Sequence, residues 1–121
     1  MKLTPLMHLR GAPARLVLAL VLMAAAVWVV FGECVGFDFV DYDDGEFITQ
    51  NPLVTARIAH PILSAFTCFS AAYYAPTLWL AYRAVYSVFG PNPAAFHALN
   101  VALHSANVAL VFLLLRRLRF G

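Results

Sequence analysis

Two long apolar stretches flank a shorter, more polar middle part of the chain. The first, residues 14–32, contains an uncharged run from Leu16 to Phe31 and approaches the roughly 20 residues that a helix needs to cross about 30 Å of hydrocarbon. The second, residues 94–115, is of similar length. The pattern therefore predicts an all-α membrane protein with two transmembrane helices.

A cleaved signal peptide is the alternative interpretation of the first stretch, because it also combines a basic start with an apolar middle. However, no pair of small residues closes the run, and Glu33 directly before Cys34 does not suit a lipoprotein cleavage site. We therefore expect an uncleaved signal-anchor helix.

The middle part, residues 33–93, is predicted to be a loop outside the bilayer with two shorter helices at the membrane surface. The first of these covers about residues 53–70, because Asn51 and Pro52 suit an N-cap and a first helical position. Pro61 is expected to bend it. Its charged and polar side chains favour the membrane surface over a span.

The second surface helix is predicted over residues 76–89. It is too short to cross a bilayer, and Arg83 in its middle opposes insertion. Four aromatic side chains lie on one stripe at helical spacing, and rings with polar tips are typical of the headgroup level. These are Trp79, Tyr82, Tyr86 and Phe89.

Charge assigns the loop to one side of the membrane. All six Asp and Glu side chains lie within residues 33–46, and each would cost about 2.5–3.5 kcal/mol at the membrane centre. Six of the eight Lys and Arg side chains lie near the chain ends, so residues 1–13 and 116–121 are predicted to be cytoplasmic. We expect an integral protein of the bacterial inner membrane or the endoplasmic reticulum, with a periplasmic or lumenal loop.

Composition excludes other classes of protein. The chain is 63% hydrophobic and 12% charged, which is far from an ordinary soluble domain. Its net charge of +2 and the position of its basic residues give no nucleic-acid-binding patch. Cys34 and Cys68 are expected to be free rather than paired.

Neither of two patterns of metal ligands is complete. Asp41, Asp43 and Gly45 alternate as in a calcium loop, but the third ligand and the glycine that should follow it are missing. His97 and His104 are two helical turns apart and lack a third ligand for zinc. We expect no metal and no other cofactor.

A polar stripe crosses the second predicted span, since His97, Asn100, His104 and Asn107 fall on one narrow arc of a helix. It either lines a water-filled or substrate cavity, or forms hydrogen bonds with other helices that are worth about 0.6 kcal/mol each. A proton-coupled transporter fragment that uses the two histidines is a further hypothesis.

The acidic loop also has two interpretations. It is either a solvated segment that opposes insertion, or a site held at the membrane surface by Phe37, Phe39 and Tyr42. In the second case the adjacent Asp43 and Asp44 are the chemical groups, because a carboxylate within about 3 Å of a hydroxyl can accept its proton.

Six short segments, in order, carry a family resemblance. They are residues 39–44 (FVDYDD), 49–52 (TQNP), 73–83 (YYAPTLWLAYR), 89–97 (FGPNPAAFH), 99–100 (LN) and 103–104 (LH). This set resembles the N-terminal part of the polytopic C-type glycosyltransferases, which use polyprenyl-phosphate-linked sugars. It is most similar to protein O-mannosyltransferase-like membrane proteins that carry tetratricopeptide repeats.

The resemblance implies that a sugar such as mannose is moved, with inversion, from a polyprenyl-phosphate donor to a hydroxyl on protein, lipid or glycan. Carried over by position, Asp43 is the general base and Asp44 is its neighbour, which orients the acceptor or a partner group.

The predicted substrate-binding residues are Arg83, Arg57, His97 and His104. Arg83 is the first candidate for a cation beside the leaving phosphate, and Arg57 is the second.

The family has many spans, whereas two are predicted here. The resemblance therefore implies an N-terminal fragment that is inactive alone and would be followed by a third span. The alternative function is a small non-enzymatic membrane subunit that docks a partner through its acidic loop and polar stripe.

Overall fold

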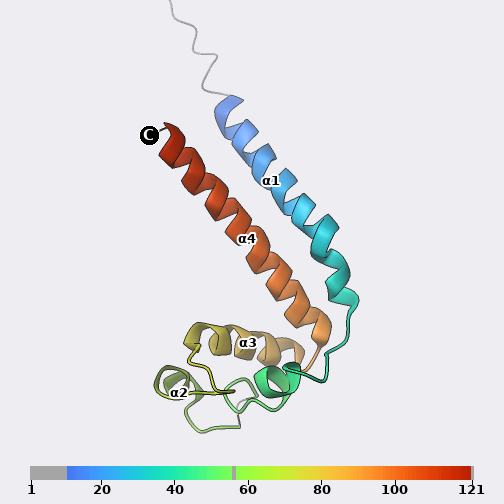
Figure 1. Ribbon diagram of the computed structural model, residues 1–121, viewed down its shortest axis with the longest axis vertical. Coiled ribbons are helices and arrows are strands. Elements are labelled where there is room, and N and C mark those ends of the chain that lie inside the picture. Colours follow the sequence, from blue (N-terminus) through green and yellow to red (C-terminus); the bar gives the residue numbers. More distant parts are fainter. Residues whose placement is uncertain (1–10, 56, 121) are drawn as a thin grey trace, which may run out of the picture. The chain divides into compact units, whose positions relative to one another are not determined.

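The computed structural model describes residues 11–55 and 57–120, and these residues are helical with irregular connections (Figure 1). The described part contains no β-strand, and one isolated bridge joins Ser70 to Tyr73. The predicted all-α class is confirmed. The elements in chain order are α1 (Gly11–Phe31), the 3₁₀-helix η2 (Gly32–Gly36), the π-helix η3 (Gly45–Thr49), α2 (Pro61–Thr67), α3 (Pro76–Phe89) and α4 (Pro93–Phe120).

Helices α1 and α4 are both long and apolar enough to cross a membrane. The candidate spans are Pro13–Gly36 and Pro93–Leu118, and only 6% of the most apolar window of each is buried. A core helix of a soluble protein would be mostly buried, so these exposed apolar surfaces favour contact with lipid or with other helices. The two long apolar helices expected over residues 14–32 and 94–115 are confirmed.

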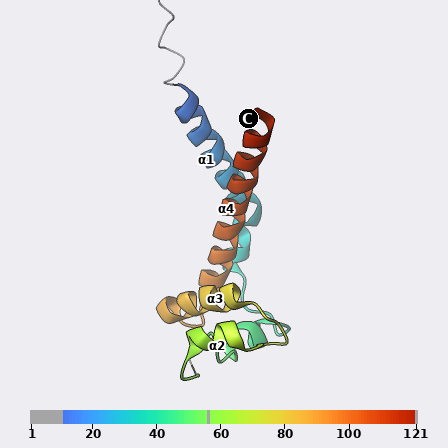
Figure 2. The ribbon, with the colours of Figure 1, turned by 90° about the vertical axis from the view of Figure 1, so that its left-hand side faces the viewer.

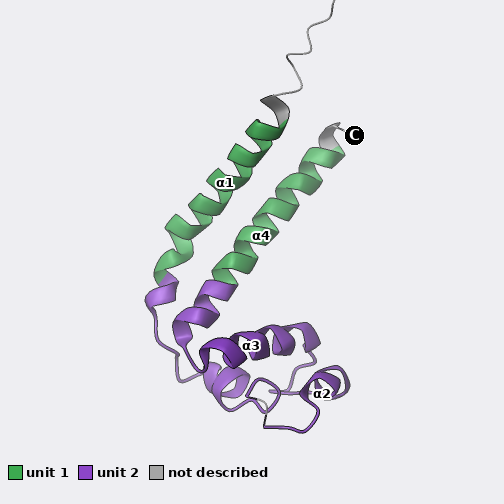
Figure 3. Ribbon diagram, turned by 180° about the vertical axis from the view of Figure 1, so that it is seen from behind, with its two compact units in different colours: residues 1–33, 100–121 green, residues 34–99 purple. Residues whose placement is uncertain are grey.

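The chain divides into two compact units, which Figure 3 colours separately. Unit 1 contains α1 and the part of α4 from Asn100 onward. Unit 2, Cys34–Leu99, contains η3, α2, α3 and the first residues of α4. Figures 1 and 2 both show α2 beside α3 within unit 2.

Unit 2 has a small hydrophobic core. Its buried members are Ile48, Leu53, Val54, Ala65, Trp79 and Phe96. They come from η3, the turn after Asn51, α2, α3 and the start of α4. Because nearly every element contributes one or two of these side chains, the acidic loop and the two short helices share one core.

The helix expected over residues 53–70 is wrong in extent, since only Pro61–Thr67 is helical. The Asn51 side chain accepts a hydrogen bond from Leu53 N–H at 3.0 Å, and its carbonyl accepts one from Thr55 N–H at 2.9 Å. These bonds close a local turn in place of a helical N-cap. Pro61 lacks an N–H group, and it starts α2 rather than bending a longer helix.

Helix α3 has the expected bounds, 76–89, but most of its aromatic stripe faces the core of unit 2. Trp79 is fully buried, and Tyr82 meets the Phe96 ring edge-on with centroids 5.3 Å apart. Only Phe89 of the stripe, at the end of the helix, is exposed. The Trp79 ring lies in the core of unit 2 rather than on an exposed stripe, and its Nε1 has no hydrogen-bond partner among the described residues. The position of α3 at the headgroup level stays a prediction.

Candidate functional site

A short turn carries the two adjacent carboxylates, and we call residues 40–44 the acidic turn. Asp44 Oδ2 accepts a hydrogen bond from Val40 N–H at 2.8 Å, which closes the turn. Short Asp side chains commonly close turns in this way. The π-helix η3 starts directly afterwards at Gly45. The hydrogen bond from Val40 N–H therefore fixes the position of the Asp44 side chain.

Asp43 differs from Asp44 in what its side chain does. Its carboxylate is exposed, and its backbone carbonyl accepts the Phe47 N–H at 2.9 Å. The backbone of Asp43 thus takes part in the local hydrogen bonding, whereas its carboxylate faces solvent. Of the pair, Asp43 is the one whose oxygens are accessible to a ligand, while Asp44 positions the turn.

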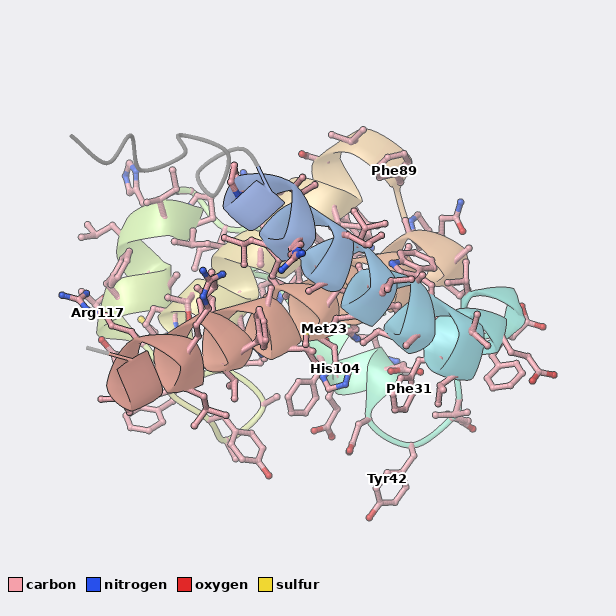
Figure 4. All side chains as sticks on the ribbon, turned by 90° about the horizontal axis from the view of Figure 1, so that it is seen from above. Met23, Phe31, Tyr42, Phe89, His104 and Arg117 are labelled. Atoms are coloured by element: carbon pink, nitrogen blue, oxygen red, sulfur yellow. The ribbon has the colours of Figure 1, made fainter. Side chains whose placement is uncertain are left out.

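The acidic turn is anchored to the core on both sides by aromatic rings. Before it, Phe39 packs on Phe96 with centroids 5.8 Å apart, and after it, Phe47 packs on Trp79 at 5.4 Å. Tyr42, in the turn itself, is 85% exposed and projects outward in Figure 4. Phe37 is also exposed. Of the three rings expected to hold the loop at a membrane, only Phe39 is used for packing inside unit 2.

Arg83 borders an open pocket of about 620 Å³ between α2 and α3. Its guanidinium is half-buried and donates a long hydrogen bond, 3.5 Å, from Nη1 to Leu53 O. The lining residues are Ala59, His60, Pro61, Ile62, Leu63, Phe66 and Arg83. A pocket with one guanidinium, one imidazole and otherwise apolar walls suits a ligand that is anionic at one point and hydrocarbon elsewhere.

The other predicted residues are not all brought to this pocket. Asp43 and Asp44 do not line it, and neither does Arg57, which is exposed in the loop before α2. His60, which sequence reasoning did not select, does line it. The available signal was its position directly before Pro61, the residue that starts α2.

The two predicted histidines lie in different units. His97, in unit 2, is half-buried, and its Nε2 is buried without a hydrogen-bond partner among the described residues. His104, in unit 1, meets the Phe31 ring edge-on with centroids 5.1 Å apart.

His104 and Asn107 line a second pocket, of about 420 Å³, in unit 1. Met23 from α1 faces the same pocket, and Figure 4 labels Met23 and His104 close to each other. The remaining walls are apolar, from Val108, Val111, Phe112 and Leu115. Asn100, another residue of the polar stripe, is exposed and does not line this pocket. The polar stripe thus supplies two side chains to an otherwise hydrocarbon pocket.

Asn51 is a structural residue that sequence reasoning treated only as a helix cap. It is 1% exposed, and its Oδ1 accepts hydrogen bonds from Leu53 N–H and from Ser70 Oγ, each at 3.0 Å. The bond to Ser70 joins two loops that are distant in the sequence. The Asn-Pro pair also signals a turn, which was the available clue.

Metal and disulfide chemistry have no organised site in the part of the chain that the structure describes. No group of three or more His, Cys, Asp or Glu side chains lies close enough to hold a metal ion among these residues. Cys34 is half-buried and Cys68 is exposed, and both are free thiols.

Comparisons of the chain with protein-family models, with curated proteins and with solved structures found no match. What the site does must therefore be argued from its own residues.

Proposed function

We propose that this chain is part of a membrane glycosyltransferase that moves a sugar, such as mannose, from a polyprenyl-phosphate donor to a hydroxyl acceptor. The observation that carries the proposal is the pocket at Arg83. A polyprenyl-phosphate sugar combines a phosphate with a long hydrocarbon chain, and the pocket combines cationic and apolar walls in the same way.

Asp43, which does not line the pocket at Arg83, supplies the base in this proposal from the acidic turn of the same unit. As the acceptor oxygen bonds to the anomeric carbon, the hydroxyl proton passes to the Asp43 carboxylate. The bond between that carbon and the phosphate oxygen breaks on the opposite face, and its electron pair leaves with the lipid phosphate. Arg83 and His60 stabilise the charge of the departing phosphate. A single displacement of this kind inverts the anomeric centre.

The roles of the other predicted residues follow from their surroundings. Asp44 positions the acidic turn, because its carboxylate is already engaged by Val40 N–H. His97 keeps a buried, unpartnered Nε2 among the described residues of unit 2, which supports a polar contact with substrate. Arg57 is exposed and is the second candidate for the phosphate. His104 belongs to the separate pocket in unit 1 and has no role in this step.

The test compares Asp43→Asn with Asp41→Asn in the native-length protein. Both residues are exposed and lie in the same turn, so the two variants change charge equally. Loss of a general base lowers transfer by about 10²- to 10⁴-fold, and we expect this for Asp43→Asn alone. Undiminished transfer by Asp43→Asn at normal expression would remove Asp43 from the mechanism.

A second candidate function is a membrane subunit that docks a partner helix. It is favoured by one observation, the exposed His104 and Asn107 beside an apolar pocket within a candidate span. Polar side chains inside a bilayer are costly unless they meet another polar group. Loss of a co-purifying partner in His104→Leu, together with undiminished sugar transfer by Asp43→Asn, would favour this function over catalysis.

A further inference from the structure

The side chain of Gln50 lies next to the acidic turn. The π-helix η3 brings it there, because Gln50 N–H donates a hydrogen bond to Gly45 O at 2.8 Å, and short π-helical turns often occur at functional sites. A Cβ atom added to Gly45 would lie 3.4 Å from Gln50 Nε2, so the amide packs directly over that glycine. Gly45 and Asp43 are two residues apart, which places their Cα atoms at most about 7 Å from each other. The exposed Gln50 side chain and the exposed Asp43 carboxylate are therefore within reach of one bound ligand.

Tyr42, directly before Asp43, presents its ring to solvent. It is 85% exposed and projects outward from the turn in Figure 4. The rings on either side of the turn, Phe39 and Phe47, pack on the core instead. A tyrosine ring offers a large, rigid apolar face with a polar tip, which is why exposed tyrosines are common where proteins bind ligands and partners. The acidic turn thus carries an aromatic face beside its free carboxylate.

A sugar residue matches the ring, the carboxylate and the amide together. One face of a sugar is made of C–H groups that pack on an aromatic ring, and its hydroxyls both donate and accept hydrogen bonds. The Asp43 carboxylate accepts from a hydroxyl, whereas the Gln50 amide donates from its nitrogen and accepts at its oxygen. A serine or threonine side chain has a single hydroxyl and no C–H face of this size, so it would use the carboxylate alone.

The charge around the acidic turn favours an uncharged acceptor. Residues 34–50 contain five carboxylates and no Lys or Arg. A phosphate or carboxylate on the acceptor would be repelled there. The two arginines of unit 2, Arg57 and Arg83, lie outside this segment, and Arg83 lines the pocket assigned to the donor phosphate. Four of the five carboxylates are exposed, namely Asp38, Asp41, Asp43 and Glu46.

We propose that the acceptor is a neutral sugar residue of a glycan, which stacks on Tyr42 and forms hydrogen bonds with Gln50 while its reacting hydroxyl lies at Asp43. This inference rests on the proposed function and names the class of its acceptor. During transfer the hydroxyl oxygen bonds to the anomeric carbon of the donor, the proton passes to Asp43, and the polyprenyl phosphate leaves with the electron pair of the broken bond. Tyr42 and Gln50 contact the acceptor away from the reacting atoms, so their loss weakens binding more than turnover.

Saturation-transfer NMR on the native-length protein in lipid nanodiscs tests acceptor binding without requiring transfer. The probes are the methyl glycosides of mannose, glucose, galactose and N-acetylglucosamine, together with a peptide rich in serine and threonine. We expect at least one glycoside to receive saturation on its ring C–H protons. Tyr42→Ala and Gln50→Ala should each raise its Kd roughly 3- to 10-fold, the range of one aromatic contact or one neutral hydrogen bond. Tyr42→Phe keeps the ring and should bind like the wild type.

Phe37→Ala is the matched control for the tyrosine, because Phe37 is also an exposed ring near the turn, at 55% exposure. It should leave glycoside binding unchanged. An equal loss of binding in Phe37→Ala and Tyr42→Ala would indicate a general effect on the loop and would overturn the stacking on Tyr42. Binding of the peptide but of no glycoside would overturn the sugar acceptor.

A transfer assay separates this inference from the proposed function. With polyprenyl-phosphate mannose as donor, the glycoside that binds should be a better acceptor than the peptide, and Tyr42→Ala should raise its KM with little change in kcat. Transfer to the peptide alone would overturn the sugar acceptor and leave the glycosyltransferase standing. Glycoside binding without transfer to any acceptor would contradict the glycosyltransferase while supporting the sugar-binding site at Tyr42 and Gln50.

Discussion

Replacing Phe96 by alanine tests how the acidic turn is held in unit 2. Phe96 is 1% exposed and contacts both Phe39, which precedes the turn, and Tyr82 on α3. Truncating a buried phenylalanine to alanine costs about 3–5 kcal/mol. Two aromatic pairs are lost, and each contributes about 0.5–1.5 kcal/mol beyond area burial, which points to the upper part of that range. The acidic turn should therefore loosen together with the core.

Hydrogen exchange of the protein in nanodiscs measures this effect. If residues 39–49 exchange by opening of unit 2, the lost free energy corresponds to roughly 10²- to 10⁴-fold faster exchange. Phe89→Ala is the matched control, because Phe89 is 60% exposed and its truncation should change stability by no more than about 0.5 kcal/mol. The packing argument fails if Phe96→Ala exchanges no faster than Phe89→Ala.

Two further substitutions probe single structural features of unit 2. Asn51→Ala leaves Leu53 N–H and Ser70 Oγ without their shared acceptor and should cost about 1–3 kcal/mol in thermal unfolding, whereas the exposed Asn100→Ala should be nearly neutral. Ala72→Gly should stabilise unit 2 by up to about 1 kcal/mol, because glycine removes the strain of a positive φ. Ala84→Gly, in the exposed face of α3, should instead destabilise by about 1 kcal/mol, and the same sign for both glycines would refute the strain argument.

The elements predicted best are those whose ends are set by nearby residues in the sequence. The length of the two apolar stretches is sufficient to predict α1 and α4. Pro76 and Gly90 mark the two ends of α3. The region after Asn51 was mispredicted because a side-chain turn competes there with a helical cap, and both use the same residues. Propensity alone cannot decide between them.

The candidate site was predictable in its residue types but not in its geometry. The adjacent carboxylates are visible in the sequence, yet only the structure separates the engaged Asp44 from the free Asp43. The pocket requires His60 and Arg83 to line one cavity although they are distant in the sequence, and such a tertiary arrangement has no local signal. The burial of Trp79 also depends on tertiary packing, which no local pattern in the sequence predicts.

The most direct test of the central claim is sugar transfer itself. The native-length protein, reconstituted with a polyprenyl-phosphate mannose donor and hydroxyl acceptors, should form a glycoside whose anomeric configuration is opposite to that of the donor. A product with retained configuration, or no transfer from any polyprenyl-phosphate sugar, would contradict the single displacement with Asp43 as base.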